Sequence, residues 1–237
     1  MKHIFRFSIV AFLFINLHKG FAQKDTLRVL FVGNSYTYYN NLPDMVSTIS
    51  KSTDTYIYTE MSAVGGARLK YHFNQEHGLK TKDLIKNGNF DIVVLQEQSM
   101  GTITNKEEFL LYSKKLSNYI KSHKAKPYFF STWSRKKTPE TQNTITKTYN
   151  EAAKKNNGIA VLVGSAWTKA IKIKPENNLH HEDGSHPSSL GTFFSACVFV
   201  KYITGKLPSK VINPKTQLLN LSDSQFYLQI ANSIPEK

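Results

Sequence analysis

Five short apolar segments recur along the chain, and longer amphipathic segments lie between them. The apolar segments, which have the composition of buried β-strands, cover residues 27–32, 55–61, 91–96, 127–132 and 159–163. The spacing of apolar residues predicts helices over 42–52, 105–122, 139–155, 165–173, 188–204 and 222–234. Strands that lack strict apolar/polar alternation and that alternate with helices are typical of a parallel sheet buried on both faces. The pattern therefore predicts an α/β fold, a three-layer α/β/α sandwich around a parallel sheet of about five strands.

The first segment of the chain has a pattern of its own. It combines a basic start at Lys2 and Arg6, an apolar run over 7–17 and small residues shortly after that run. This is the layout of a secretory signal peptide, and the apolar run is too short to span a bilayer comfortably. We therefore expect residues 1–22 to be a signal peptide, with a buried N-terminal helix as the alternative. The mature protein is then expected to be periplasmic or secreted.

The remaining residues, 23–237, contain no internal repeat, no low-complexity linker and no break in composition that would mark a second domain. They are numerous enough for one α/β domain with a full core. No later segment reaches the length of a membrane span, so no membrane span is expected. The pattern favours no particular oligomeric state.

The chain is basic, with 31 Lys and Arg against 17 Asp and Glu and a formal charge of +14. Loss of a leader that contains Lys2, Arg6 and Lys19 and no acid would lower this charge to +11. The lysines are scattered through the expected helices, without an Arg-rich arm, a zinc finger or a helix-turn-helix pattern. A solvated basic surface is therefore favoured over nucleic-acid binding. Cys197, the only cysteine, lies in an apolar helical run and is expected to be a core residue.

Polar residues follow each expected strand at the edge of the sheet where parallel α/β proteins form their sites. The segments after the five strands that carry these residues are 33–35, 63–66, 96–99, 133–135 and the late loop 177–191. A serine nucleophile needs a base, and the base needs an acceptor that fixes its tautomer. Ser35, His186 and Asp183 have the chemistry for these three roles.

A tetrahedral intermediate also needs preorganised hydrogen-bond donors for its oxyanion. The backbone N–H of Ser35, an N–H from Gly65 or Gly66 and a side-chain amide after the third strand are the candidates.

Three sequence blocks carry a resemblance to a known family. The stretches "GNSYT", "AVGGARL" and "DGSHPS" occur in the order and spacing of the SGNH (GDSL-like) hydrolase superfamily, which the chain resembles along its whole mature length. The stretch "LQEQS" and the leader ending "FAQ" are similar to an exported, Bacteroidetes-type branch. The resemblance implies a flavodoxin-like SGNH fold. It also implies that Ser35 is the nucleophile, His186 the base and Asp183 the orienting residue, and that Gly66 rather than Gly65 donates to the oxyanion.

The chain departs from the family pattern at two places. Asn34 stands where the first block has Asp, and its side chain is expected to make the same kind of bond to the backbone of the turn. The third block lacks its asparagine, and "VVLQEQSMG" offers Gln96 and Gln98 instead. We expect Gln98 to complete the oxyanion hole, with Gln96 as the second choice.

The resemblance implies a serine esterase that works through an acyl-enzyme and needs no metal and no cofactor. The expected substrate is a small-molecule or glycan ester that carries a small acyl group, acetyl above all, on a carbohydrate. A lipase or lysophospholipase is the alternative enzyme, and a non-catalytic glycan-binding protein on the same fold is the alternative of another class. Tyr36, Trp133 and Arg135 are the candidate substrate-binding residues, with packing as their alternative role.

Two further readings concern the same loops. The stretch "HHEDGSH" contains His180, His181, Asp183 and His186, which could form a metal site. It lacks a recognised ligand spacing and a second source of ligands, so no metal is expected. Glu97 could act as a catalytic acid, but a solvated or helix-capping role is favoured.

Overall fold

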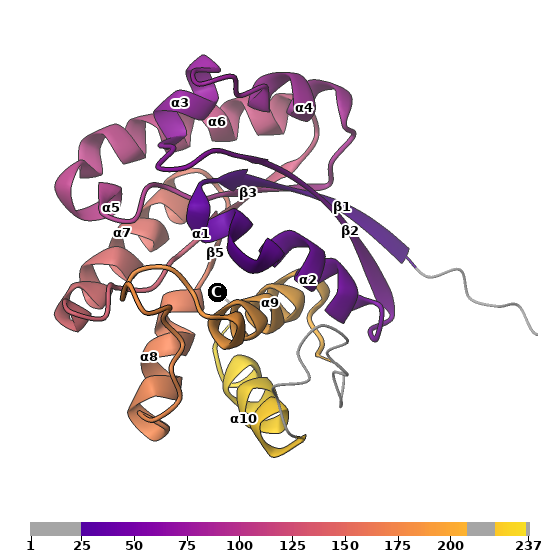
Figure 1. The fold of residues 1–237 in the computed structure, drawn as a ribbon. Helices are drawn as coiled ribbons and strands as arrows, with labels where there is room; N and C mark the ends of the chain where they lie inside the picture. Colours follow the sequence, from indigo (N-terminus) through magenta and orange to yellow (C-terminus); the bar gives the residue numbers. More distant parts are fainter. Residues whose placement is uncertain (1–24, 208–220, 236–237) are drawn as a thin grey trace, which may run out of the picture.

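The computed structural model describes residues 25–207 and 221–235, and the expected signal peptide, 1–22, lies outside them. The described residues form a five-stranded parallel sheet between two layers of helices (Figure 1). The strands are β1 (Asp25–Gly33), β2 (Thr55–Ala63), β3 (Ile92–Leu95), β4 (Lys126–Phe130) and β5 (Ile159–Val161). They lie in the order β2-β1-β3-β4-β5, and every neighbouring pair is parallel. The predicted three-layer α/β/α fold is therefore confirmed.

The helices predicted from periodicity are also present. They are α2 (Leu42–Ser50), α6 (Lys106–Ser122), α7 (Gln142–Lys155), α8 (Val163–Ile173), α9 (Ser189–Thr204) and α10 (Leu221–Asn232). The short helices α1 (Ser35–Tyr38), α3 (Leu69–Asn74), α4 (Thr81–Asn87) and α5 (Gly101–Thr104), and the 3₁₀ turns η1 (Tyr39–Asn41) and η2 (Pro139–Thr141), complete the described elements. We did not predict the four short helices, because one or two turns are too short to show a helical period.

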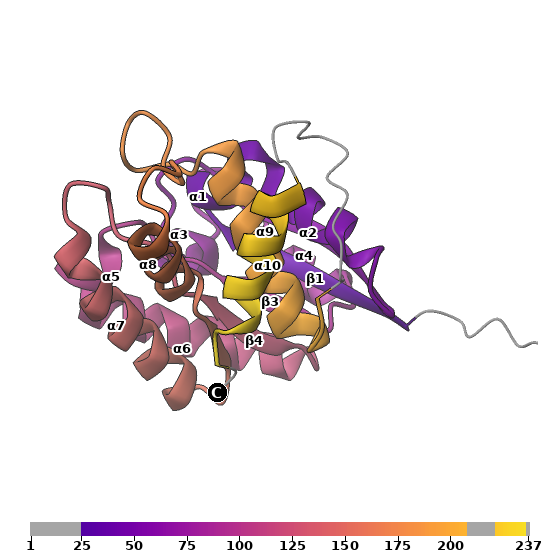
Figure 2. The ribbon, with the colours of Figure 1, turned by 90° about the horizontal axis from the view of Figure 1, so that it is seen from below.

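Alternate residues of the central strand enter two different cores. Val29 and Phe31 of β1 pack with α2, α8, α9 and α10, whereas Leu30 and Val32 pack with α3, α4, α6 and α7. Helix α10 lies outside α9 on its face of the sheet (Figure 2). Cys197 of α9 is fully buried, as expected of a core residue. No helix within the described ranges is long and apolar enough to cross a membrane.

The strand order places a crevice at the end of β1. From β1 the chain moves to β2 at one edge of the sheet and then crosses to β3 on the other side of β1. The loops that leave β1 and β3 therefore diverge, which is where open α/β sheets bind their ligands. The side chains of Thr37 and Gln96 lie so close to the backbone at the end of β1 that position 33 requires glycine. A Cβ there would lie 2.3 Å from Thr37 Oγ1 and 2.4 Å from Gln96 Oε1.

Candidate active site

The turn after β1 presents Ser35 at the first position of α1. Asn34 caps this helix, because its Oδ1 accepts the N–H of Tyr36 at 3.1 Å. The Asn34 Nδ2 donates to the carbonyl of Ala67 at 2.9 Å and so joins this turn to the glycine block. Asn34 thus makes the side-chain-to-backbone bonds that we expected in place of the family's aspartate.

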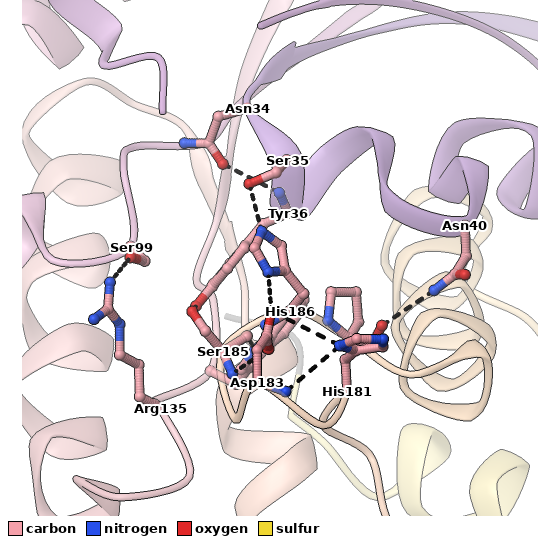
Figure 3. A network of polar contacts seen from close by, with 12 residues as sticks. Asn34, Ser35, Tyr36, Asn40, Ser99, Arg135, His181, Asp183, Ser185 and His186 are labelled. Carbon is pink, nitrogen blue, oxygen red and sulfur yellow. Dashed lines mark hydrogen bonds and ion pairs between the residues drawn. The ribbon is translucent and has the colours of Figure 1, made fainter. Parts of the chain in front are cut away.

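Ser35, His186 and Asp183 form a continuous row of hydrogen bonds, which we call the relay (Figure 3). The Oγ of Ser35 lies 2.9 Å from Nε2 of His186, and Nδ1 of His186 lies 2.5 Å from Oδ2 of Asp183. The side chains of His186 and Asp183 are 28% and 41% exposed. The relay therefore lies at the surface of the crevice, open to a ligand from solvent.

The Asp183 carboxylate also shapes the loop that carries His186. Its Oδ1 accepts the backbone N–H groups of Ser185 at 2.8 Å and of His186 at 2.9 Å. Desolvation would raise the pKa of Asp183, but the hydrogen bonds from His186 and from these two N–H groups outweigh it and hold the pKa well below its usual range. Asp183 is therefore ionised and keeps the proton of His186 on Nδ1.

Neighbouring side chains fix the position of His186. The ring of Tyr39 stacks on the His186 ring, with centroids 4.7 Å apart. Asn40 donates from Nδ2 to the carbonyl of Pro187 at 3.1 Å and to Thr192 Oγ1 at 2.9 Å. The loop then enters α9 through the predicted serine cap, since Ser188 Oγ accepts the N–H of Gly191 at 3.1 Å. The segment that follows His186 is thus held against η1 and α9.

Behind the nucleophile lies a second group of polar side chains, Asn34, His72, Gln96 and Glu97, which we call the buried platform. Each is between 0% and 4% exposed. Gln96 Oε1 accepts both the backbone N–H of Asn34 and the hydroxyl of Thr37, each at 3.0 Å. Gln96 Nε2 donates to the carbonyl of Glu97. Gln96 therefore supports the Ser35 turn from below.

His72 also belongs to the buried platform, and the sequence analysis predicted no role for it. Its Nε2 lies 2.9 Å from the carbonyl of Gly33, and its Nδ1 lies 2.8 Å from Thr81 Oγ1. Because a carbonyl only accepts, Nε2 carries the proton and Nδ1 accepts from the Thr81 hydroxyl. Desolvation lowers the pKa of His72 to about 4, so the ring is neutral at pH 7.

Glu97 joins the third block to the glycine block. Its carboxylate accepts the N–H of Leu69 at the start of α3 at 3.1 Å and the N–H of Gln98 at 2.8 Å. Desolvation raises the pKa of Glu97 to about 7. The helix-capping role expected for Glu97 is present, but the residue is buried rather than solvated.

A pocket of about 190 Å³ opens in front of Ser35. Gly66 and Gln98 line it together with Ser35 and His186. Gly66 has a φ of 69°, a left-handed conformation that favours glycine. Within the described residues, no hydrogen-bond acceptor is assigned to the backbone N–H of Ser35 or of Gly66. The structure thus brings the first-choice oxyanion donors to the pocket, whereas Gly65 and Gln96 do not line it.

Two of the three expected substrate-binding residues line the same pocket. Tyr36 and Arg135 are at its wall, and Arg135 Nη2 donates to Ser99 Oγ at 3.0 Å (Figure 3). Trp133 does not line the pocket and is only 2% exposed. It stacks beneath Tyr36 with ring centroids 4.8 Å apart, and packing against the ring of Trp167 at 4.0 Å holds the indole in the core. The substrate-contact role expected for Trp133 is therefore replaced by a supporting one.

Several residues of the pocket were missed in the sequence. Ser99 and Ser185 line it, and Ser185 Oγ lies 2.7 Å from the hydroxyl of Tyr36. Both stand beside residues of the recognised blocks, which is the signal that could have identified them. Asn40 and His72 have no such signal, because their partners are far away in the sequence.

The histidines of "HHEDGSH" point in different directions. His180 Nε2 lies 2.9 Å from the carbonyl of Ser134, and the ring packs edge-on against Trp167. His181 Nδ1 is 3.8 Å from the Asp183 carboxylate, on the opposite side of the relay from Arg135 (Figure 3). Among the residues that the structure describes, no group of three or more His, Cys, Asp or Glu side chains is placed to hold a metal ion.

Comparisons with solved structures agree with this fold. A protein from Slackia heliotrinireducens described as an SGNH hydrolase matches with a TM-score of 0.64 and 26% identity, over 75% of this chain and 98% of that chain. A DUF4886 family protein from Bacteroides uniformis matches with a TM-score of 0.75 and 14% identity, over 88% and 94%. An acetyl xylan esterase, AlAXEase, matches with a TM-score of 0.58 and 16% identity, over 75% and 100%. No protein-family model and no curated protein sequence matches the chain.

The class of protein follows from these matches and from the parallel sheet. The chain has the fold of the SGNH (GDSL-like) hydrolases, and the resemblance drawn from its sequence blocks is confirmed. The Slackia heliotrinireducens protein, at 26% identity, is described as an SGNH hydrolase, which indicates that this chain is a hydrolase.

Proposed function

We propose that the protein is an exported serine esterase that releases small acyl groups, acetyl above all, from carbohydrates. The observation that carries this proposal is the relay, in which a serine hydroxyl, an imidazole and a carboxylate are joined at 2.9 Å and 2.5 Å. Such a row makes serine a nucleophile at neutral pH. Ser35 is the nucleophile, His186 the base and Asp183 the orienting residue.

In the first half of the reaction, Ser35 Oγ forms a bond to the carbonyl carbon of the ester, and its proton passes to Nε2 of His186. The imidazolium that forms donates from Nδ1 to the ionised Asp183. The oxyanion of the tetrahedral intermediate accepts hydrogen bonds from the N–H groups of Ser35 and Gly66 and from the amide of Gln98. The C–O bond then breaks, and Nε2 returns the proton to the departing alcohol.

The second half of the reaction releases the acid. A water molecule gives a proton to Nε2 of His186 and attacks the acyl carbon. The oxyanion occupies the same donors, and the bond to Ser35 Oγ breaks as Nε2 returns the proton to the serine. None of these steps draws on a metal or an organic cofactor.

The size and polarity of the pocket support a small acyl group. The cavity in front of Ser35 is about 190 Å³, and Asn34, Gln98 and Ser185 are among its polar lining. A long hydrocarbon chain would gain little in such a space. The fold is also similar to that of an acetyl xylan esterase, at 16% identity, which supports the proposal of a carbohydrate ester as the substrate. Export rests on the sequence pattern of residues 1–22.

A panel of esters tests the function. Turnover should be highest for acetyl esters and should fall as the acyl chain lengthens from acetate to decanoate. In Ser35→Ala, kcat should fall by about 10⁴-fold or more, while Tm stays near that of the wild type. Faster turnover of decanoate than of acetate would favour the lipase or lysophospholipase reading. Glycan binding without turnover of any ester would favour a non-catalytic protein.

A further inference from the structure

A second pocket lies next to the one in front of Ser35. Its volume is about 380 Å³, twice that of the smaller pocket. The loop after β4, the last turns of α8 and the segment before His180 form its walls. Arg135 lines both pockets, so the two pockets adjoin at this residue. The backbone N–H of Lys136 donates to the carbonyl of Gly184 at 2.8 Å, which fixes this wall to the loop of the relay.

The second pocket is positively charged. Arg135, Lys136 and Lys172 line it, and its lining contains no carboxylate. Among the residues that the structure describes, none of these three cations forms an ion pair. By contrast, the neighbouring Lys174 is bound to Asp223 at 3.0 Å. The pocket therefore has three cationic groups whose charge no acidic partner compensates.

The cations stand beside apolar surface. Ile171, Leu179, Pro139 and Pro175 contribute to the lining. A sugar ring presents apolar C–H faces, and a uronic acid adds a carboxylate that arginine and lysine bind well. A fatty acyl chain would use the apolar surface but would gain nothing from three cations. The combination thus matches an acidic carbohydrate better than a lipid chain.

We propose that this second pocket binds the alcohol part of the substrate, and that the preferred substrate is an acetylated acidic oligosaccharide with uronate units. The part of this proposal that concerns the acetyl ester rests on the esterase function proposed above. The acetyl ester occupies the small pocket at Ser35. Arg135, at the junction, contacts the sugar that carries the ester, and Lys136 and Lys172 bind a carboxylate further along the chain.

Turnover of two matched polymers tests the preference. The wild type should show a kcat/KM for acetylated polygalacturonate about tenfold above that for acetylated xylan at low salt. The ratio should shrink when salt is raised to about 0.5 M, because exposed charge pairs are screened. In the double variant Lys136→Gln/Lys172→Gln the ratio should fall about three- to tenfold. The control Lys147→Gln/Lys169→Gln removes the same charge outside the pocket and should keep the wild-type ratio. A wild-type ratio near one, or an equal fall in both double variants, would overturn the proposal.

Direct binding separates this proposal from the esterase function. Calorimetry on Ser35→Ala should show tetragalacturonate bound at least tenfold more tightly than xylotetraose, and Lys136→Gln/Lys172→Gln should abolish this difference. Binding of tetragalacturonate by a protein without esterase activity would support the pocket and reject the esterase. Equal affinity for the two tetramers in an active esterase would reject the pocket and leave the esterase standing. If a lysophospholipid is hydrolysed in preference to both polymers, the cations of the second pocket bind a phosphate group, and the proposal of an acidic glycan is overturned.

Discussion

The relay in front of the nucleophile and the buried platform behind it are both polar, but they are built differently. Asp183 and His186 lie on one surface loop, three residues apart, and their side chains are 41% and 28% exposed. The platform residues come from three separate segments and are at most 4% exposed. A group that transfers protons to a substrate must be open to that substrate. A group that holds the nucleophile turn works best where its hydrogen bonds do not compete with water.

The two regions should therefore respond differently to substitution. Changes in the relay should remove turnover and leave the fold intact. Changes in the platform should lower the free energy of unfolding first and affect turnover through the position of Ser35. The expected effects below separate the two.

Asp183→Asn should give the largest effect. The Asn oxygen can still accept the N–H groups of Ser185 and His186, so the loop should stay folded. The new amide NH₂ would face Nδ1 of His186 and favour the tautomer that carries its proton on Nε2, which cannot accept a proton from Ser35. We expect kcat to fall about 10⁴-fold with little change in Tm. A fall of less than about tenfold would show that Asp183 does not set the tautomer.

Gln98→Ala should give the next largest effect. Gln98 lines the pocket at Ser35, and a side-chain donor to an oxyanion is typically worth about 10²- to 10³-fold in turnover. We expect steady-state kinetics to show a lower kcat at a nearly constant KM. If kcat falls by less than about threefold, the backbone N–H groups of Ser35 and Gly66 alone form the oxyanion hole.

Gln96→Ala should act on stability instead. The substitution would leave the buried N–H of Asn34 without its acceptor and the carbonyl of Glu97 without its donor. Each such orphaned group costs about 1–3 kcal/mol, so we expect the free energy of unfolding in urea to fall by about 2–6 kcal/mol. A kcat loss larger than that of Gln98→Ala, at unchanged stability, would transfer the oxyanion role to Gln96.

The smallest expected effect is the pH dependence of stability. Glu97, with its pKa raised to about 7, contributes stability that is full below pH ~4.5 and is lost as the pH rises through 7. His72, with its pKa lowered to about 4, contributes stability that is full above pH ~6.5 and is lost as the pH falls through 4. The two contributions oppose each other, so the wild type should vary little over this range.

Two variants separate these contributions. In Glu97→Gln only the contribution of His72 should remain. The free energy of unfolding in urea should then fall by about 1–3 kcal/mol as the pH is lowered from 6.5 to 4. In His72→Gln only the contribution of Glu97 should remain. The free energy of unfolding should then fall by a similar amount as the pH is raised from 4.5 to 7. Parallel pH profiles for the wild type and both variants would mean that neither group titrates differently in the folded and unfolded protein.

The sequence was sufficient to predict those regions that a short run of neighbouring residues identifies. The strands β3 and β5 are continuous apolar runs, and the other three strands are rich in apolar and β-branched residues. The relay residues Asp183 and His186 belong to one short block beside the cap of α9. The turn at Ser35 could be recognised in the same way, because a glycine, an asparagine and a serine follow a strand.

The platform could not be predicted in full, because its contacts join residues that are far apart in the chain. Gln96 binds Asn34 across 62 positions, and His72 binds Gly33 across 39. A single histidine or glutamine carries no sign of such a partner. Trp133 shows the same difficulty, since its direction after β4 is set by packing against Tyr36 and Trp167. The cationic pocket also combines residues from three separate segments.

Covalent labelling tests the central claim, that Ser35 is an activated nucleophile, most directly. A fluorophosphonate should lose fluoride as Ser35 Oγ bonds to phosphorus and His186 takes the proton. Ser99 and Ser185 line the same pocket and serve as internal controls, because neither is hydrogen-bonded to His186. We predict one adduct per chain, mapped to Ser35 by mass spectrometry of peptides, and none in Ser35→Ala. No adduct in the folded wild type, or an adduct on Ser99 or Ser185 instead, would contradict the claim.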